Sequence, residues 1–235
     1  MTTRFRSPLR LQVGQEISLG NDEAYHLNVV LRARSGTSVH VVDAEGRLFR
    51  AVVRTINPSV LQIEAELEGS STTPDRVLEC WVPLLKGGRT DGLIRQLTEL
   101  GASKICVFLS ERSEVRPNAP ARTKQLERFR RLSDESTRQC RRTDRVAIEN
   151  HGALPQDGPG FFLWEEGGAP LAEVMAGLDD DPIRVLVGPE GGLSASEASA
   201  LEACGWRAVH LGGRILRAET AVLAAATLVI YGAQS

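Results

Sequence analysis

From residue 77 onward, short apolar runs alternate with longer segments of helical periodicity, and this alternation constrains the fold most. Parallel strands need long crossover connections, usually helices, so the pattern predicts a mostly parallel sheet covered by helices on both faces. An ordinary doubly wound sheet is the expectation on these grounds, because backbone knots are nearly absent from proteins. The expected strands are 77–85, 105–109, 160–164, 183–187 and 207–211, and the expected helices are 91–100, 121–140, 170–178, 194–204 and 217–232.

The first 70 residues follow a different pattern, that of β-structure. Residues 60–68 alternate apolar and polar side chains with period two, which is typical of a strand with one wet face. Residues 38–42 and 48–56 are two further expected strands, joined by the turn-forming sequence Asp43-Ala-Glu-Gly46. Short strands at this spacing indicate a small barrel. Since 69–75 is small and polar, like a linker, we expect two domains, 1–70 and 76–235.

Composition excludes several classes of protein. A net charge of −2 over 235 residues excludes a polycation, so a nucleic-acid surface would have to be a local patch. The N-terminus has no apolar core of signal-peptide length, and the most apolar stretch, Ala221 to Tyr231, is too short to span a bilayer. The four cysteines are widely spaced and form no CxxC pair. We therefore expect a cytoplasmic protein with no disulfide framework, no metal site and no membrane partner.

The loop Gly188-Pro-Glu-Gly-Gly192 stands between an expected strand and an expected helix. Ser194 and Glu197 fit a capping box at the start of that helix, so the loop has a purely structural reading as a tight turn. The functional reading is a ligand cradle, because ligands of open α/β sheets bind at the carboxyl ends of strands and glycine permits close approach.

A second loop, Leu211-Gly-Gly-Arg-Ile-Leu-Arg-Ala-Glu-Thr-Ala221, repeats the arrangement of a strand, glycines and a helix. Glu219 in the first helical turn could simply complement the helix dipole. Two such loops after two apparently parallel strands could also share one ligand.

Basic residues are concentrated between Arg112 and Arg145, where eleven Lys and Arg stand against five Asp and Glu. Such a run is usually a solvated helix face, yet almost all of these cations are Arg, which pairs with phosphate and stacks on bases. The segment Lys86-Gly-Gly-Arg89 follows another expected strand and is either a polar turn or a phosphate contact. The excess of Lys and Arg between Arg112 and Arg145 predicts contact with nucleic acid.

These motifs together resemble the 16S ribosomal RNA (uracil-N3)-methyltransferase family of the SPOUT class of α/β-knot methyltransferases. The resemblance is carried by VGPEGGLSASE (187–197) and LGGRILRAETA (211–221). It extends nearly end to end, through His26-Leu27 with Val30-Leu31-Arg32, Lys86-Gly-Gly-Arg89, Thr98-Glu-Leu-Gly101, Glu111-Arg-Ser113 and Gln139-Cys140 with Arg142.

The resemblance implies an α/β fold with a C-terminal trefoil knot, a PUA-like, RNA-binding N-terminal β-barrel, and a homodimer with the knots at its interface. It implies methyl transfer from S-adenosylmethionine to N3 of a uridine in 16S rRNA of the small ribosomal subunit. That uridine is conventionally numbered 1498 and lies in the decoding region.

The resemblance also assigns residues. The expected cofactor-binding set is Leu163, Trp164, Glu165, Val187, Gly188, Pro189, Glu190, Gly191, Gly192, Leu211, Gly212, Ile215, Leu216, Arg217, Thr220 and Ala221. The catalytic candidates are Arg217 and then Arg89 for stabilising the uracil anion, with Glu190 or Glu219 as the base. The expected RNA-binding residues are Arg4, Arg6, Arg32, Arg34, Lys86, Arg89, Arg112, Arg138 and Arg142.

Three alternatives remain at this stage. The first is a SPOUT methyltransferase acting on transfer RNA or on another ribosomal position. The second is an RNA-binding or ribosome-assembly protein without catalysis. The third, a nucleotide-dependent oxidoreductase, lacks the dinucleotide fingerprint.

Overall fold

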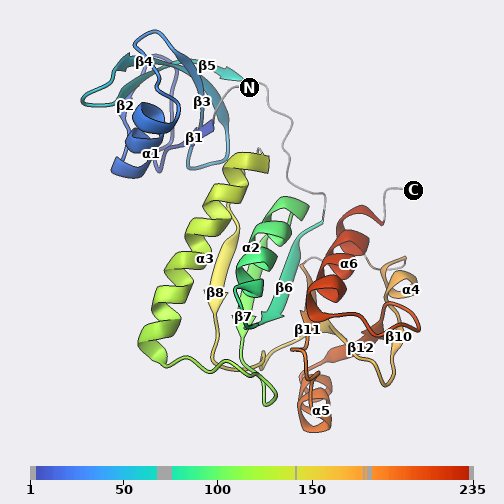
Figure 1. Ribbon diagram of the computed structural model, residues 1–235. Coiled ribbons are helices and arrows are strands. Elements are labelled where there is room, and N and C mark those ends of the chain that lie inside the picture. Colours follow the sequence, from blue (N-terminus) through green and yellow to red (C-terminus); the bar gives the residue numbers. More distant parts are fainter. Residues whose placement is uncertain (1–3, 68–75, 141, 177, 179–181, 233–235) are drawn as a thin grey trace. The chain divides into compact units, whose positions relative to one another are not determined.

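The structure, a computed structural model, describes residues 4–67, 76–140, 142–176, 178 and 182–232 (Figure 1). The chain forms two compact units. The first contains residues 1–73 together with Thr137–Arg145, and the second contains Pro74–Ser136 and Val146–Ser235. The segment Thr137–Arg145 thus packs with the first unit although it lies within the predicted domain 76–235. The predicted linker, 69–75, lies outside the described residues, and the domain boundaries stay a prediction.

The first unit is built on a five-stranded sheet of order β1-β3-β4-β5-β2. The predicted strands are confirmed as β3 (Ser38–Val42), β4 (Leu48–Thr55) and β5 (Val60–Leu67). Four further elements were not predicted: β1 (Arg4–Arg6), β2 (Glu16–Ser18), helix α1 (Asn21–Tyr25) and the π-helical turn η1 (His26–Val30). All pairs are antiparallel except β1 with β3, and the arrangement is consistent with the expected small barrel.

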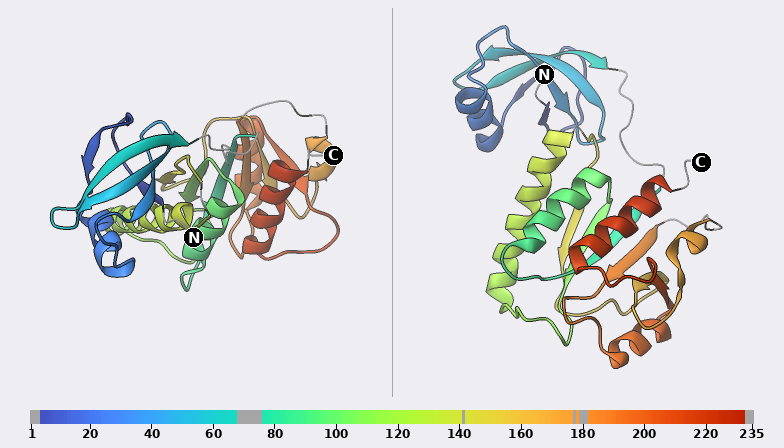
Figure 2. Two further views of the ribbon diagram at one scale, coloured as in Figure 1. Left: turned by 90° about the horizontal axis from the view of Figure 1, so that it is seen from above. Right: turned by 45° about the vertical axis from the view of Figure 1, so that its right-hand side comes forward.

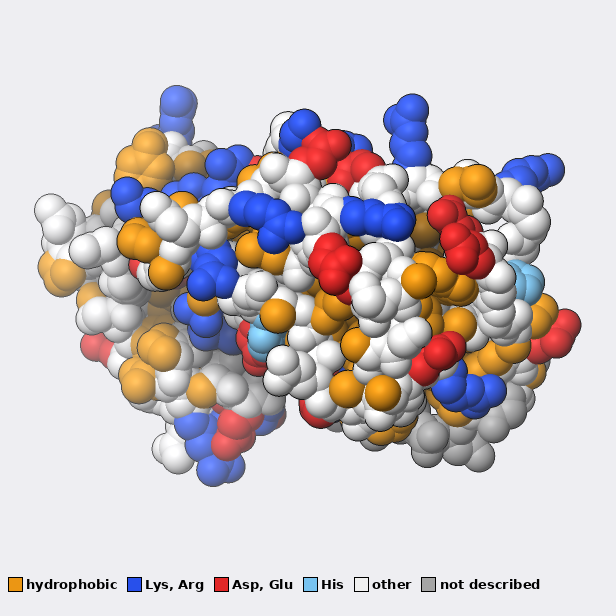
Figure 3. Space-filling view, turned by 90° about the horizontal axis from the view of Figure 1, so that it is seen from below, with side chains coloured by type: hydrophobic (Ala, Val, Ile, Leu, Met, Phe, Trp, Pro, Cys, Tyr) orange, Lys and Arg blue, Asp and Glu red, His pale blue; other side chains and the backbone are white. Residues whose placement is uncertain are grey.

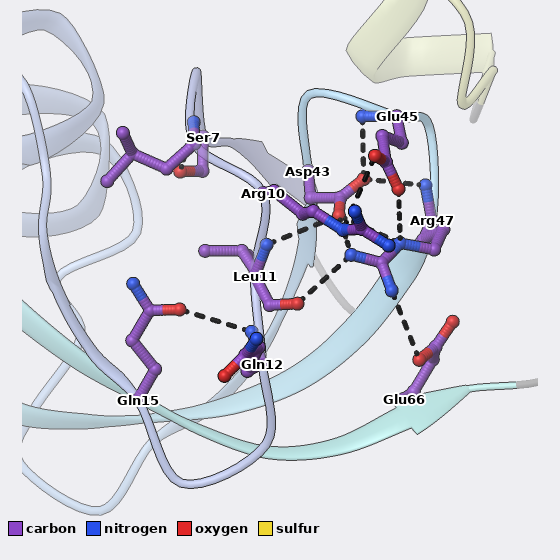
Figure 4. Close-up of polar contacts among 10 residues, drawn as sticks. Ser7, Arg10, Leu11, Gln12, Gln15, Asp43, Glu45, Arg47 and Glu66 are labelled. Atoms are coloured by element: carbon purple, nitrogen blue, oxygen red, sulfur yellow. Dashed lines mark hydrogen bonds and ion pairs between the residues drawn. The ribbon is translucent and has the colours of Figure 1, made fainter.

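Asp43 organises the turn after β3 from a buried position (Figure 4). Its carboxylate accepts hydrogen bonds from the backbone N–H groups of Leu11, Glu45 and Arg47, at 3.3, 2.9 and 2.9 Å. The Arg47 guanidinium also donates to it, at 2.6 Å, and reaches the Leu11 carbonyl. Burial alone would raise the pKa of Asp43, but these hydrogen bonds outweigh burial and lower that pKa below its ordinary value.

Asp43→Asn is expected to lower the free energy of unfolding by about 2 kcal/mol at pH 7, because buried donors lose a charged acceptor. The folded pKa of Asp43 is depressed, so its stabilisation is fully present above the ordinary carboxyl pKa of about 4. It is lost as the pH falls through the lowered value, so the difference between wild type and variant shrinks in acid. Denaturant unfolding at several pH values, followed by circular dichroism, measures both effects. Glu45→Gln, two residues along the same turn and half exposed, is the control and should cost less than about 0.5 kcal/mol.

The second unit is built on a seven-stranded sheet of order β10-β12-β9-β11-β6-β7-β8, and every pair in it is parallel. The predicted strands are confirmed within one or two residues as β6, β7, β9, β11 and β12, whereas β8 and β10 were missed. The bounds are β6 (Leu78–Pro83), β7 (Lys104–Phe108), β8 (Ala147–Asn150), β9 (Gly160–Leu163), β10 (Ala169–Pro170), β11 (Ile183–Val187) and β12 (Trp206–His210).

Helices cover the two faces of this sheet unequally (Figure 2). The five predicted helices are confirmed as α2 (Arg89–Leu100), α3 (Ala119–Cys140), α4 (Leu171–Met175), α5 (Ala195–Ala203) and α6 (Ala218–Tyr231). Side chains of α2, α3, α4 and α6 form one core with the side of the sheet that carries Val82, Val107 and Val185. Among the helices that the structure describes, α5 alone contributes to the core on the other side, against Trp81, Phe108 and Phe162. Among the described residues, no helix is both long and apolar enough to cross a membrane.

Candidate functional site

Four loops of the second unit follow strands that are neighbours and parallel, in the order β12-β9-β11-β6. Because the carboxyl ends of parallel strands meet at one edge, the loops 84–88, 164–168, 188–194 and 211–217 all begin at that edge. The two glycine loops singled out in the sequence therefore lie on either side of the loop that follows β9. Ligands of such sheets bind at this edge.

The Gly188–Gly192 loop is a tight turn held by backbone contacts. The Gly192 N–H donates to the Pro189 carbonyl at 2.9 Å, and Gly192 has a φ of +69°, which favours glycine. The predicted capping box is confirmed, since the Ser194 side chain accepts from the Glu197 N–H and the Glu197 carboxylate accepts from the Ser194 N–H. The tight turn and the capped start of the helix are therefore both present, and the exposed residues Glu190 and Gly191 take no part in the cap.

Glu111 and Arg112, which are adjacent in sequence, hold this loop in place. Arg112 donates from Nη1 to the Gly191 carbonyl oxygen at 2.8 Å, and the Glu111 N–H donates to Glu197 Oε1 at 2.8 Å. A Cβ atom on Gly191 would lie 3.2 Å from the Arg112 Cβ. Arg112 thus positions the glycine loop by contact, and Gly191 leaves the space that this contact needs.

Arg89 connects the two glycine loops to each other. Its guanidinium pairs with Glu190, from the loop after β11, and with Glu219 of α6 at 3.2 Å. The second carboxylate oxygen of Glu219, Oε2, is buried and has no partner among the described residues. Such an orphaned acceptor suits a ligand that brings a hydroxyl or amino donor.

The loop after β12 presents unpaired side chains to solvent. Ile215 is 84% exposed and Leu216 is 37% exposed. Arg217 is the N-terminal cap residue of α6 and is exposed, and neither it nor Arg214 makes a side-chain polar contact within the described part of the chain. Arg217 is therefore available to a substrate, whereas Arg89 is already engaged by two carboxylates.

The remaining expected cofactor residues lie at the same edge. Leu163 ends β9, and the Trp164 N–H donates to the Val209 carbonyl at 2.9 Å, while Glu165 is exposed. Leu211 is half-buried, Gly212 and Thr220 are exposed, and Val187, Pro189 and Ala221 are buried. Figure 3 views this edge of the second unit and shows Lys and Arg mixed with Asp, Glu and hydrophobic side chains. The edge is not a uniformly basic surface.

The expected RNA-binding residues of the second unit all have partners. Lys86 pairs with Glu114, Arg89 pairs with Glu190 and Glu219, and Arg112 donates to Gly191.

Those of the first unit differ in exposure. Arg32 and Arg34 are exposed, and Arg32 has a φ of +50°. Arg4 and Arg6 are half-buried, and Arg6 donates to the Asp144 carbonyl at 2.8 Å. Arg138 lies 3.4 Å from Glu23. Arg142 is 4% exposed and pairs with Asp144, so any contribution that it makes to RNA binding is indirect.

Arg89, Glu190 and Glu219 are recognisable in the sequence as candidates, but their pairing is not, because 101 and 130 residues separate Arg89 from its two partners. The same holds for Arg112, which was expected to contact RNA and instead contacts the glycine loop 79 residues away. No local pattern encodes these contacts, since the parallel sheet brings the loops together.

A family model described as an RNA methyltransferase domain matches residues 73–230. Among curated relatives, the ribosomal RNA small subunit methyltransferase E of Synechocystis is 28% identical over 87% of this chain and 69% of its own length. The protein of the same name from Bacillus subtilis is 25% identical over 94% of this chain and 92% of its own length.

Solved structures of methyltransferases are also similar to this chain. The ribosomal RNA small subunit methyltransferase E of Neisseria gonorrhoeae, bound to S-adenosylmethionine, is 26% identical, with a TM-score of 0.84 and 98% of each chain covered. A methyltransferase structure from Legionella pneumophila has a TM-score of 0.86 at 22% identity over 97% of each chain, a likeness of fold.

Proposed function

Because the chain belongs to the RNA methyltransferase domain family, we propose that it methylates N3 of a single uridine in 16S rRNA, the one conventionally numbered 1498. It is an enzyme that uses S-adenosylmethionine and acts on ribosomal RNA. The observation that carries the proposal is the meeting of both glycine loops at one sheet edge, joined there by Arg89.

The residues present at the edge fit S-adenosylmethionine. The proposed cofactor site has Gly188–Gly192 as one wall, Leu211–Arg217 as the second and Leu163–Glu165 as the third, with backbone groups of Leu211, Ile215 and Leu216 toward the adenine. The orphaned Glu219 Oε2 offers an acceptor to a hydroxyl or amino group of the cofactor. When bound, the cofactor supplies a methyl group on a positively charged sulfur.

The chain's own residues have three tasks in the reaction. They hold the uracil out of its stack, remove the proton from N3, and stabilise the negative charge that deprotonation spreads onto O2 and O4. Arg217 is our first assignment for the last task because it is exposed and without a side-chain partner in the described residues. Arg89 is better suited to positioning, since it already pairs with Glu190 and Glu219. Those two carboxylates are the candidates for the base.

The remaining parts of the proposal concern fold and assembly. A trefoil knot in the second unit is supported by the strand order, in which β11 is inserted between β6 and β9 instead of added at an edge. A homodimer through the knot is supported by the aromatic side chain at the end of α6, Tyr231, which is 48% exposed. We assign residues 1–70 to a PUA-like, RNA-binding barrel and the enzyme to the cytoplasm, in keeping with ribosomal RNA as substrate.

Transfer of a labelled methyl group tests the proposed function. The purified protein is given labelled S-adenosylmethionine with 16S rRNA, small ribosomal subunits or transfer RNA. Label is expected in 16S rRNA, free or within subunits, and absent from transfer RNA. Label in transfer RNA would favour another RNA as substrate, and RNA binding without any transfer would favour a non-catalytic assembly protein.

RNA affinity is expected to fall steeply with salt, because released counterions accompany each phosphate contact. About five contacts to single-stranded RNA predict a loss of about 100-fold between roughly 50 and 200 mM salt. Arg34→Ala should reduce the slope by about one contact, whereas Arg54→Ala, an exposed arginine outside the predicted set, should leave it unchanged. Fluorescence anisotropy with a 16S rRNA fragment measures the slope. Affinity that barely changes with salt would contradict the assignment of these arginines.

A further inference from the structure

A cavity of about 480 Å³ lies in the second unit, on the face of the sheet that α5 covers only in part. Its charged lining includes Glu79, Lys104 and Arg184, which are the first or second residues of β6, β7 and β11. The cavity therefore extends toward the amino-terminal ends of the strands, away from the edge where the glycine loops begin. Nothing in the methyl-transfer proposal uses it.

Three side chains with metal-binding atoms meet beside this cavity. Glu149 and His151 line it, and Cys106 lies behind them with no exposed surface. Glu149 Oε2 is 2.8 Å from His151 Nε2 and 3.9 Å from Cys106 Sγ, and all three donor atoms lie within 4.8 Å of one another. The other oxygen of Glu149, Oε1, pairs with Lys104 at 3.0 Å, so Oε2 is not needed for that ion pair.

The fold holds the three donors in position. Cys106 and Glu149 are register partners in the parallel pair β7 and β8, so both side chains point to the same face. The backbone N–H of His151 donates to the Val107 carbonyl at 2.6 Å. The imidazole packs on the Trp81 ring, with 4.7 Å between the two ring centroids. Trp81 is itself 7% exposed, and its Nε1 has no partner in the described residues. An indole N–H without an acceptor can donate to a water molecule, such as one that occupies the open position of a metal ion bound here.

We propose that Cys106, Glu149 and His151 bind one zinc-class divalent cation, which links β7 to the edge strand β8. Tetrahedral zinc with Zn–S of about 2.3 Å and Zn–N and Zn–O of about 2.0 Å places sulfur and oxygen about 3.5 Å apart, and nitrogen and oxygen about 3.3 Å apart. The observed 3.9 and 2.8 Å each differ from these values by about half an ångström, which side-chain rotation accommodates. The mixed sulfur, nitrogen and oxygen donors favour zinc over magnesium or calcium.

Charge and protons balance in this site. Binding releases the thiol proton of Cys106 to solvent and moves the imidazole proton of His151 from Nε2 to Nδ1. One thiolate and one carboxylate then neutralise the divalent ion, Lys104 keeps its contact with Oε1 of Glu149, and Glu79 in the same cavity lining supplies the negative charge that faces Lys104. Water from the cavity can complete the fourth position.

Cobalt(II) is the probe for the test, because thiolate ligation gives it a charge-transfer band that water and carboxylates do not give. The intact protein, freed of bound metal with a chelator, is titrated with cobalt(II) and then with zinc(II). One equivalent of cobalt is expected to give the thiolate band, and zinc is expected to abolish it by displacement. Zinc should also raise the melting temperature, since it binds only the folded arrangement.

Three variants assign the ligands. Cys106→Ser is expected to lose the thiolate band, and His151→Gln, at a half-exposed position, to weaken cobalt binding at least about tenfold. Cys80→Ser is the matched control, because Cys80 is equally buried but lies on the neighbouring strand and faces the opposite core. It should keep both band and affinity. The proposal is overturned if the wild type gives no thiolate band, if the band survives in Cys106→Ser, if Cys80→Ser abolishes it, or if His151→Gln binds cobalt normally.

Discussion

Gly191→Trp is expected to weaken S-adenosylmethionine binding at least about 100-fold, which corresponds to about 2.7 kcal/mol. A Cβ at this position would already be 3.2 Å from the Arg112 Cβ, so an indole has to displace Arg112 or fill the edge where the cofactor is proposed to bind. Displacement of Arg112 also disturbs the hydrogen bond from its guanidinium to the Gly191 carbonyl. Titration calorimetry measures the dissociation constant directly.

Two controls separate this effect from general damage. Gly191→Ala adds only the Cβ and should weaken binding by no more than a few fold, since the Arg112 side chain can shift by the few tenths of an ångström needed. Gly20→Trp places the same indole in the first unit, where a Cβ meets no atom within 4 Å, and should bind normally. Normal cofactor affinity in a well-folded Gly191→Trp would show that the loop is only a turn.

Arg217→Ala is expected to lower the single-turnover rate of methyl transfer about 100-fold to 1,000-fold while cofactor and RNA affinities stay within about threefold. The reason is that a cation placed beside the uracil acts only as negative charge develops on O2 and O4. Arg217 suits this role because it caps α6 at the proposed site and makes no side-chain polar contact among the described residues. Rapid-quench measurement with saturating RNA isolates the transfer step.

Arg214→Ala is the matched control for Arg217→Ala. Arg214 lies three residues earlier in the same loop and is equally exposed, so a general loss of positive charge would affect both variants alike. We expect Arg214→Ala to retain its rate within about threefold. Full turnover in Arg217→Ala, with binding intact, would remove Arg217 from the catalytic set.

Periodicity predicted the long, strongly patterned elements of this fold well. The strand 183–187 and the helix 91–100 appear as β11 and α2, and Gly101 ends α2 with a φ of +115°, as a C-terminal glycine should. Missed elements are short or polar. The strand β8 contributes one buried apolar residue, Ile148, and β10 contains two residues, so neither offers a period to detect.

The sequence predicted individual residues and local motifs of the candidate site, but not the long-range contacts between them. The capping box of Ser194 and Glu197 could be identified because its residues are three apart. The ion pairs of Arg89 could not, because they depend on the order of strands in the sheet. For the same reason the spacing of cysteines and histidines in the sequence does not reveal the cluster of Cys106, Glu149 and His151. The register partners Cys106 and Glu149 are 43 residues apart. A short stretch of sequence can show the period of a helix, but it does not determine the order of strands in a sheet.

The central claim, that one uridine of 16S rRNA is methylated at N3, is tested most directly by nucleoside analysis. Unmethylated 16S rRNA or small subunits are incubated with the protein and S-adenosylmethionine, digested to nucleosides and analysed by mass spectrometry. The account predicts close to one 3-methyluridine per RNA with wild type, and none with Gly191→Trp. A methyl group found on a ribose, on another base or on several uridines would contradict it, as would the absence of any methylated product.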